Sequence, residues 1–408
     1  MTYVEAVQFL YSLGNEVQTA KLGLERINRL LESLGNPHRA CKFVHVAGTN
    51  GKGSTCAMIE AGLRAAGIRT GLYTSPHLVE PVERIQIAGA PVSREQFADT
   101  FNQVHQIADR MRTAGVLDLH PTYFETITAM GFLLFERAEV DTVVLEVGLG
   151  GRLDATNVVT PRLSVITPVD LDHQAFLGDS IEQIAAEKAG ILKPGVPAVF
   201  AEQCERVESV LRSFARGRYV LARERPVERV HLDSRGSVFC LDGEEIRCPL
   251  AGEHQIQNAR TAALALGELG VPACGIANTT WPGRLEQVAD NPKVILDGAH
   301  NPAAARALAR FIQRFYSNRR VWIVFGVMRD KAVSEIAESL FPLAHRVILT
   351  APESSRALAP EQIPAPGAAI THHVGEALEL AREAAPEDVV FITGSLFVVG
   401  EARRLLVK

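Results

Sequence analysis

The stretch Lys42-Phe43-Val44-His45-Val46-Ala47, continued by Gly48-Thr49-Asn50-Gly51-Lys52-Gly53-Ser54-Thr55, decides the fold. Its first six residues form a β-type run, and a glycine-rich turn leads from them into a predicted helix over residues 53–66. Backbone N–H groups at such a helix N-terminus can face a triphosphate, while a lysine reaches the outer phosphates. The sequence therefore predicts a phosphate-binding loop.

The spacing of this loop differs from the usual G-x-x-x-x-G-K-[ST] pattern. The second glycine follows the first by three positions instead of five, and Gly53 separates Lys52 from the hydroxyl of Ser54. A glycine turn with an incidental lysine is the alternative, but lysine, flanking glycines and a preceding strand coincide here.

Outward from the loop, short apolar runs alternate with stretches of helical period, which is typical of an α/β protein with a mostly parallel sheet. We expect strands at 42–47, 69–73, 141–147, 162–167 and 197–201. We expect helices at 22–34, 53–66, 93–113, 123–138 and 180–189. The first domain thus resembles a P-loop NTPase.

Residues 218–250 change character, since turn signals there separate short strands that suggest a small antiparallel addition to the main sheet. A helix over 253–269 follows, and we place a domain boundary near 284, giving domains of 1–283 and 284–408. The second domain is predicted to be a smaller Rossmann-like α/β domain. Its expected strands lie at 292–297, 320–326, 345–350 and 388–393, and its expected helices at 302–316, 331–340, 374–384 and 396–406.

Composition excludes several classes of protein. The 408 residues are 47% hydrophobic and 22% charged, as in an ordinary globular protein. With 42 basic and 47 acidic residues the net charge is −5, so no general basic field exists for nucleic acid or an anionic membrane. No apolar run approaches the ~20 residues of a membrane-spanning helix, and the N-terminus lacks the features of a signal peptide.

The cysteines indicate a compartment. All six lack a C-x-x-C partner and are expected to be small buried hydrophobes in a reducing environment. We predict a cytoplasmic protein without zinc.

Further polar residues follow predicted strands and so come to the carboxyl edge of the sheet, where open α/β sheets bind ligands. Glu146 ends an apolar run and is either a magnesium ligand or a polar strand cap. Ser75 taken alone is a turn hydroxyl, and His173 is either a structural group or a ligand. For Lys188, near the end of a predicted helix, a favourable interaction with the helix dipole is the simpler interpretation.

Together these segments resemble the folylpolyglutamate synthase/dihydrofolate synthase family of the Mur ligase group. The resemblance rests on ordered motifs along nearly the whole chain: Gly48–Ser54, Tyr73–Leu78, Glu146–Asn157, Leu171–His173, Glu187–Ile191, Pro282–Arg284, Asp297–Pro302 and Thr393–Ser395. It implies an ATP-dependent ligase that joins L-glutamate to dihydropteroate, to the glutamyl chain of reduced folates, or to both, through an acyl phosphate.

The resemblance also implies residue roles. ATP would contact Thr49, Asn50, Gly51, Lys52, Gly53, Ser54, Asn258, Arg284 and Asp297. Two magnesium ions would be held by Ser75, Glu146, His173 and Lys188, the last in carbamylated form. The pterin-bearing substrate would lie against Thr122, Tyr123, Phe124, Glu125, Leu153, Asp154 and Ala155, and the incoming glutamate near His300 and Ser395. Lys52, Lys188 and His300 are the expected catalytic residues.

Two other functions remain open. A cell-wall Mur ligase would share the chemistry, but only 47 residues precede Gly48, too few for the N-terminal domain expected of those enzymes. The other is a P-loop protein without ligase chemistry, in which the bound nucleotide switches a surface that contacts a partner. We expect a monomer that uses only small-molecule substrates, with no nucleic acid or membrane partner; pterin preference and glutamate chain length are not decided by the sequence.

Overall fold

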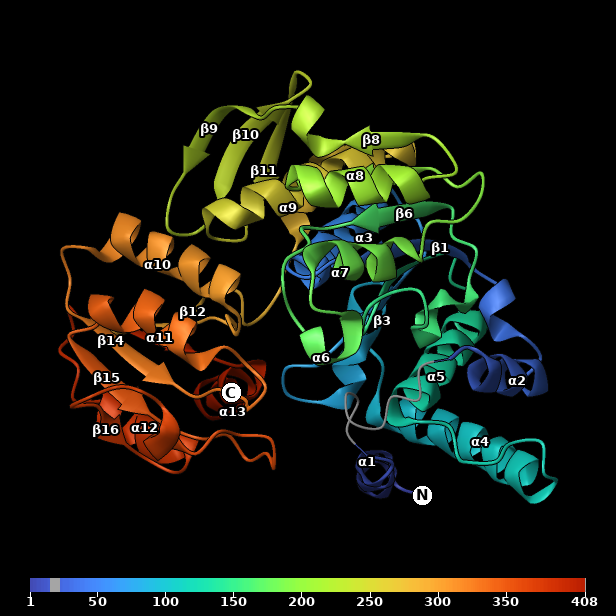
Figure 1. Ribbon diagram of the computed structural model, residues 1–408, viewed down its shortest axis with the longest axis horizontal. Coiled ribbons are helices and arrows are strands. Elements are labelled where there is room, and N and C mark those ends of the chain that lie inside the picture. Colours follow the sequence, from blue (N-terminus) through green and yellow to red (C-terminus); the bar gives the residue numbers. More distant parts are fainter. Residues whose placement is uncertain (15–22, 408) are drawn as a thin grey trace. The chain divides into compact units, whose positions relative to one another are not determined.

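The computed structural model describes residues 1–14 and 23–407 (Figure 1). Contacts divide them into two compact units, of which the larger holds Met1–Val227, Leu241–Ile246 and Gln257–Asn278. The smaller unit holds Glu228–Cys240, Arg247–Ile256 and Thr279–Lys408.

The larger unit is built on an eight-stranded sheet of order β4-β3-β2-β5-β1-β6-β7-β8. The strand β1 that begins the loop motif lies near its centre, parallel to β5 and β6. At one edge β3 pairs antiparallel with β2, and β4 pairs antiparallel with β3. The bounds of the strands are β1 Lys42–Ala47, β2 Thr70–Tyr73, β3 Ile85–Ile87, β4 Ala90–Pro91, β5 Thr142–Glu146, β6 Leu163–Ile166, β7 Ala198–Phe200 and β8 Tyr219–Leu221.

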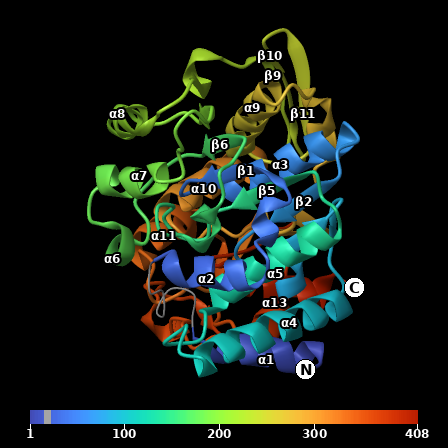
Figure 2. The same cartoon turned by 90° about the vertical axis from the view of Figure 1, so that its right-hand side faces the viewer.

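Apolar helix faces cover this sheet. One core cluster joins Phe43, Val143 and Leu145 of the sheet to α1, α2, α4 and α5, and another joins Ile166 and Phe200 to α7 and α8. The helices of this part are α1 Tyr3–Ser12, α2 Glu25–Ser33, α3 Lys52–Ala65, α4 Arg94–Thr113, α5 Tyr123–Arg137, α6 Gln174–Leu177, α7 Ile181–Ala189, α8 Glu205–Phe214 and α9 Glu253–Glu268. Figure 2 shows α1 and α4 side by side below the sheet.

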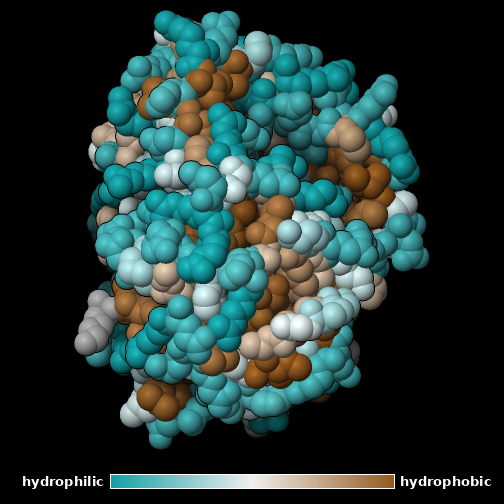
Figure 3. All heavy atoms as spheres, turned by 90° about the vertical axis from the view of Figure 1, so that its left-hand side faces the viewer, coloured by the Kyte–Doolittle hydropathy of each residue, from teal (hydrophilic) through white to brown (hydrophobic). Residues whose placement is uncertain are grey.

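The smaller unit contains a six-stranded sheet of order β12-β13-β17-β14-β15-β16, parallel except for the edge strand β12. Its strands are β12 Glu286–Asp290, β13 Lys293–Leu296, β14 Val321–Phe325, β15 Arg346–Leu349, β16 Ala369–Ile370 and β17 Val389–Thr393. Its helices are α10 Pro302–Tyr316, α11 Val333–Leu340, α12 Val374–Ala381 and α13 Leu396–Leu406. The face in Figure 3 is largely hydrophilic, with apolar residues in separate patches.

The predicted α/β class and mostly parallel sheets are confirmed, with several corrections. Of the strands expected in 218–250, β8 joins the main sheet as a parallel strand, whereas β9 Glu228–Leu232, β10 Ser237–Leu241 and β11 Glu244–Cys248 form a sheet of their own. The antiparallel addition to the main sheet is instead β3 and β4. The expected helix at 22–34 is α2, and residue 22 lies outside the described residues.

The structure shows the state of the cysteines and the character of the helices. Each of the six cysteines is free, but Cys204 and Cys274 are exposed and Cys41 is only partly buried, so the expectation that all six are buried was wrong for these three. Among the described residues, no helix combines the length and apolarity that a membrane crossing requires.

Candidate active site

The glycine-rich loop joins the end of β1 to the start of α3, as its motif predicted. Gly48 has φ +150 and Gly51 has φ +81, conformations that side chains rarely adopt. Lys52 is the first residue of α3, and its Nζ donates to the carbonyl oxygen of Thr49 at 3.2 Å, so the ammonium folds back over the loop. The loop thus combines a helix N-terminus with a local cation.

Close packing also demands glycine in the loop. A Cβ on Gly48 would lie 1.8 Å from Oγ1 of Thr167, and one on Gly51 would lie 2.2 Å from Oδ1 of Asn258. Asn258 belongs to α9, far along the chain, and its amide therefore lies against the loop. The structure thus places Asn258 beside the loop, and its contact with ATP stays a prediction.

We predict that Gly48→Ala destabilises the protein by about 1–3 kcal/mol, because strain in the backbone adds to a clash. Gly267→Ala on α9 is the matched control, since its Cβ would meet nothing within 4 Å, and it should stabilise slightly. Urea unfolding followed by circular dichroism measures both. Equal stability of Gly48→Ala and the wild type would contradict the described loop geometry.

Glu146 lies at the carboxyl edge beside the loop. Glu146 pairs with Val46 of β1, and it is buried, with 4% of its surface exposed. One carboxylate oxygen accepts the backbone N–H of Ser75 at 3.1 Å, so the segment after β2 is tied to the end of β5. Ser75, Glu146 and the loop therefore meet at one edge of the sheet.

Lys188 is buried at 5% exposure in the last turn of α7. Its pKa is lowered to about 7, chiefly by burial and then by the charge of Lys52, while Asp172 and Asp154 oppose the effect. The side chain is thus close enough to Lys52 to feel its charge. Lys188 does lie in the last turn of a helix, but an enclosed lysine of lowered pKa is not explained by an interaction with the helix dipole alone.

His173 follows Asp172 at the start of α6. Its backbone is left-handed, with φ 52, and its N–H donates to Oδ1 of Asp172 at 2.9 Å. Its Nε2 lies 3.9 Å from the other carboxylate oxygen of Asp172. Among the described residues, one compact group of three histidine, cysteine or carboxylate donors is found, and it consists of other residues. Neither Glu146 nor His173 belongs to it.

Asp154 organises the loop between β5 and β6. Its carboxylate is buried and accepts the N–H groups of Gly148 at 3.1 Å, Leu149 at 2.9 Å and Thr156 at 3.0 Å. Burial raises the pKa of this carboxyl, and these donors lower it. Leu153 and Ala155 are thereby fixed on either side of it.

The two segments expected to contact the pterin come together. A Cβ on Gly148 would lie 2.5 Å from Cζ of Phe124, so the ring of Phe124 packs on the loop that Asp154 holds. Thr122 caps α5 and exchanges hydrogen bonds with Glu125, the third residue of that helix.

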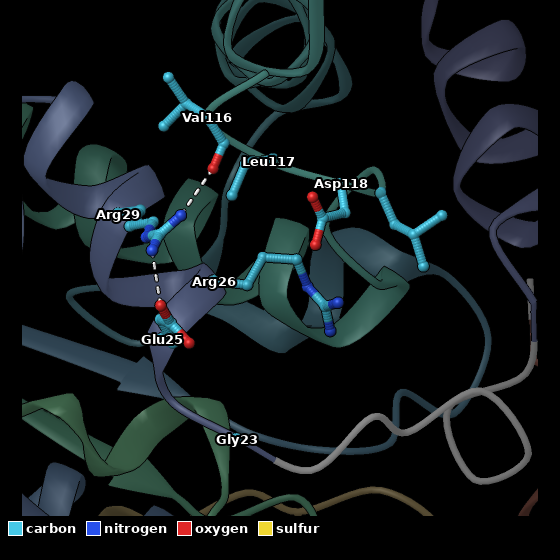
Figure 4. A pocket seen from close by; sticks show the side chains of 8 residues that line it. Gly23, Glu25, Arg26, Arg29, Val116, Leu117 and Asp118 are labelled. Carbon is cyan, nitrogen blue, oxygen red and sulfur yellow. Dashed lines mark hydrogen bonds and ion pairs between the residues drawn. The ribbon is translucent and has the colours of Figure 1, made fainter.

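Sequence reasoning missed two residues here. Arg26 of α2 donates to Oε2 of Glu125 at 2.6 Å, and His45 of β1, fully buried, lies 2.9 Å from Oγ1 of Thr156. Arg26 also lines a pocket of about 260 Å³, where Figure 4 shows Arg29 between Glu25 and the carbonyl of Val116. Only tertiary contact shows these pairings, since the partners are distant along the chain.

The smaller unit holds the other predicted residues at the carboxyl ends of β13 and β17, which are parallel neighbours. The buried carboxylate of Asp297 accepts N–H groups from Leu285 and Ala299, each at 3.0 Å. Burial raises its pKa and Arg284 opposes that rise. A Cβ on Gly298 would lie 2.2 Å from Nη1 of Arg284, which confirms the close approach of that arginine.

His300 and Ser395 lie on the same edge. Nδ1 of His300 is 2.8 Å from the carbonyl oxygen of Gly298, which can only accept, so Nδ1 carries the hydrogen and Nε2 is the basic nitrogen of the neutral ring. Ser395 caps α13 by accepting the N–H of Val398 at 3.2 Å, so its hydroxyl has a structural task as well.

The chain is similar in sequence to known protein families and proteins. Residues 46–266 match the Mur ligase middle domain, and residues 283–396 match the Mur ligase glutamate ligase domain. The dihydrofolate synthase/folylpolyglutamate synthase of Bacillus subtilis is 34% identical over 428 residues, covering 95% of each chain. A probable bifunctional folylpolyglutamate synthase/dihydropteroate synthase of Haloferax volcanii is 36% identical, and this chain spans 50% of its length.

Solved structures are similar as well. The folylpolyglutamate synthase of Mycobacterium tuberculosis, complexed with ADP, superposes with a TM-score of 0.91 at 34% identity, covering 100% of this chain and 99% of that one. Escherichia coli FolC in complex with DHPP and ADP superposes with a TM-score of 0.87 at 31% identity, covering 99% and 97%.

Proposed function

The chain belongs to the folylpolyglutamate synthase/dihydrofolate synthase family of the Mur ligases, and from this membership we propose that it joins L-glutamate to dihydropteroate and to reduced folates at the expense of ATP. The observation that carries the proposal is the glycine-rich loop with Lys52 at a helix N-terminus, together with the buried carboxylate of Glu146 on the strand next to β1 and the buried Lys188, whose pKa Lys52 helps to lower. Such an arrangement suits phosphoryl transfer, where the protein supplies position and charge.

The reaction needs two steps because a carboxylate is a poor acyl donor. An oxygen of the folate carboxylate attacks the γ-phosphorus of ATP, and ADP leaves. The amine of glutamate then attacks the acyl carbon, phosphate leaves and the amine loses a proton. In the first step Lys52 neutralises charge as two anions approach, and the N–H groups at the start of α3 orient the phosphates.

The residues at the edge of the sheet fit magnesium. Buried carboxylate oxygen at Glu146 and a hydroxyl at Ser75 are suitable oxygen donors beside phosphate oxygens, and we assign His173 as a further ligand on the family resemblance alone. Bound there, two ions would supply charge neutralisation. Lys188 fits carbamylation, since a pKa of about 7 leaves much of the amine neutral near pH 7 and the modified group is an anion.

The remaining residues are proposed to bind and orient the three substrates. We assign Asn258, Arg284 and Asp297 to the nucleotide and the segments Thr122–Glu125 and Leu153–Ala155 to the pterin substrate. His300, with Nε2 as its basic nitrogen, would accept the proton of the attacking amine, and Ser395 would contact the glutamate. With domains of 1–283 and 284–408, the pterin segments and Asn258 belong to the first domain, and Arg284, Asp297, His300 and Ser395 belong to the second.

The free cysteines bear on the cellular compartment. Six free cysteines favour the cytoplasm, where thiols stay reduced and ATP is available. All substrates are small molecules, and we propose that the chain acts as a monomer.

Glutamate-dependent release of ADP tests this function. Purified protein with Mg-ATP and glutamate is offered dihydropteroate or tetrahydrofolate, and the conjugated product is identified by mass spectrometry. We expect both acceptors to be used. Hydrolysis of ATP that does not respond to glutamate would instead indicate a nucleotide switch.

Arg26→Ala is expected to raise KM for the pterin substrate several-fold while KM for ATP stays unchanged, because Glu125 loses its partner at the start of α5. Arg29→Ala on the same helix is the control, since Arg29 bonds to exposed Glu25 and to a carbonyl and not to the α5 segment. Steady-state kinetics distinguishes the two, and equal effects on both KM values would contradict this role.

A further inference from the structure

Three side chains outside the proposed active site form a compact donor group. His105 and Asp109 lie on α4, and His120 lies in the segment between α4 and α5. Donor atoms of all three lie within 4.8 Å of one another. The sequence interpretation considered zinc only through cysteines, so this histidine pair escaped it.

Hydrogen bonding fixes which nitrogen of each ring is available. Nδ1 of His120 lies 2.8 Å from the carbonyl oxygen of Pro121, which can only accept, so this nitrogen carries the hydrogen. Nε2 of His105 lies 3.3 Å from Oδ2 of Asp109, a carboxylate that accepts from it. In neutral rings the lone pairs of His105 Nδ1 and His120 Nε2 therefore face each other.

These two nitrogens are 3.3 Å apart. That separation is longer than the usual N–H hydrogen-bond distance of about 2.9–3.0 Å. Two nitrogens bound to one tetrahedral zinc ion at about 2.0–2.1 Å lie about 3.3–3.4 Å apart. The distance between Nδ1 of His105 and Nε2 of His120 thus matches the distance between two nitrogens bound to the same tetrahedral metal ion.

The rings are also held in place. The ring of Phe9 on α1 lies 4.5 Å from that of His105 and 5.4 Å from that of His120, measured between centroids, and Phe101 stacks on His105 at 5.5 Å. The side chain of His105 is only 15% exposed. Fixed orientation lowers the cost of ordering the ligands when an ion binds.

We propose that Nδ1 of His105 and Nε2 of His120 bind a divalent transition-metal ion of the zinc type, with water completing its coordination. Asp109 and the carbonyl of Pro121 hold the outer N–H groups of the two rings, as carboxylates and carbonyls do for metal-bound histidines. Imidazole favours zinc, copper and nickel over magnesium. The ion would join α4 to the segment that leads to Thr122.

Titration of the full chain with Co²⁺, in saturating Mg²⁺, tests the site through the visible absorption of tetrahedral cobalt, with Zn²⁺ as competitor. We expect one Co²⁺ per chain, displaced by Zn²⁺ and removed by EDTA. His105→Ala and His120→Ala should abolish the signal, and Asp109→Asn should weaken binding by about 10- to 100-fold. His231→Ala, at an exposed position of β9, is the control and should bind normally.

Circular dichroism confirms that each variant is folded, and Asp109→Asn retains both ligating rings should an alanine variant fail to fold. Wild-type binding by folded His105→Ala and His120→Ala would overturn the proposal. Loss of the signal in His173→Ala would also overturn it, because the ion would then lie at the nucleotide. Ligase activity in Mg-ATP should be unchanged in His105→Ala, so the proposal stands or falls separately from the proposed function.

Discussion

Lys52→Ala should lower kcat by at least about 10²–10³-fold, the usual effect of removing one group that stabilises transition-state charge. Lys52 is the first residue of α3 and folds over the glycine-rich loop, so its charge serves the phosphates. Its positive charge also lowers the pKa of Lys188. The variant would therefore leave Lys188 protonated more often, which hinders carbamylation and adds to the loss.

The fold should survive this change, because Lys52 is only part-buried and belongs to no apolar core. Lys42→Ala is the matched control, since Lys42 is exposed at the opposite end of β1. Steady-state kinetics with thermal unfolding of both variants checks the prediction. A folded Lys52→Ala protein with near wild-type kcat would remove the phosphate-binding role.

Lys188→Ala should lower kcat by a similar factor, provided that the lysine acts as a carbamate. An ammonium beside magnesium ions would repel them, whereas a carbamate would attract them. Acetate or another small carboxylate should partly restore activity by filling the vacated space. Lys193→Ala is the control, because Lys193 is only half-buried and its Nζ contacts the carbonyl of Asn157.

Wild-type activity is expected to rise with pH. Carbamate forms from the neutral amine, whose fraction rises as pH increases through the lowered pKa of about 7. Wild-type activity at fixed carbon dioxide should therefore increase from about pH 6 to about pH 8. Electron density of an unmodified ammonium at Lys188, in a metal-bound structure and turned away from Glu146, would contradict the carbamate.

Local pattern predicted much of the fold. The buried strands β1, β5, β14 and β17 are apolar runs, and turn signals or caps mark their ends. Three helices, α1, α6 and α8, were missed, and the reason is clearest for α1. Helix α1 buries only Ala6 and Leu10, so it lacks a strong apolar stripe, although Thr2 and Glu5 form a capping box.

Edge strands were missed as well. Strand β12 reads Glu-Gln-Val-Ala-Asp and is mostly exposed, so neither an apolar run nor clear alternation marks it. Its pairing with β13 alone makes it a strand.

At the site, motifs placed Lys52 and Glu146 because Lys52 follows the glycine-rich turn after β1 and Glu146 is the last residue of β5. Lys188 could not be interpreted in this way. Its burial, and the effect of Lys52 on its pKa, depend on packing between segments far apart in the chain, whereas local spacing favoured a lysine that interacts with the helix dipole. The same reason hid Arg26, whose partner Glu125 lies 99 positions away.

Transfer of ¹⁸O tests the central claim, that ATP activates the folate carboxylate by phosphorylating it. Dihydropteroate labelled with ¹⁸O in its carboxylate is turned over with glutamate and Mg-ATP in unlabelled water, and the released phosphate is analysed by mass spectrometry. An acyl phosphate requires that each phosphate carry one carboxylate oxygen, so we predict one ¹⁸O per phosphate formed. Phosphate without ¹⁸O, in a reaction that still yields the glutamyl product, would contradict the account.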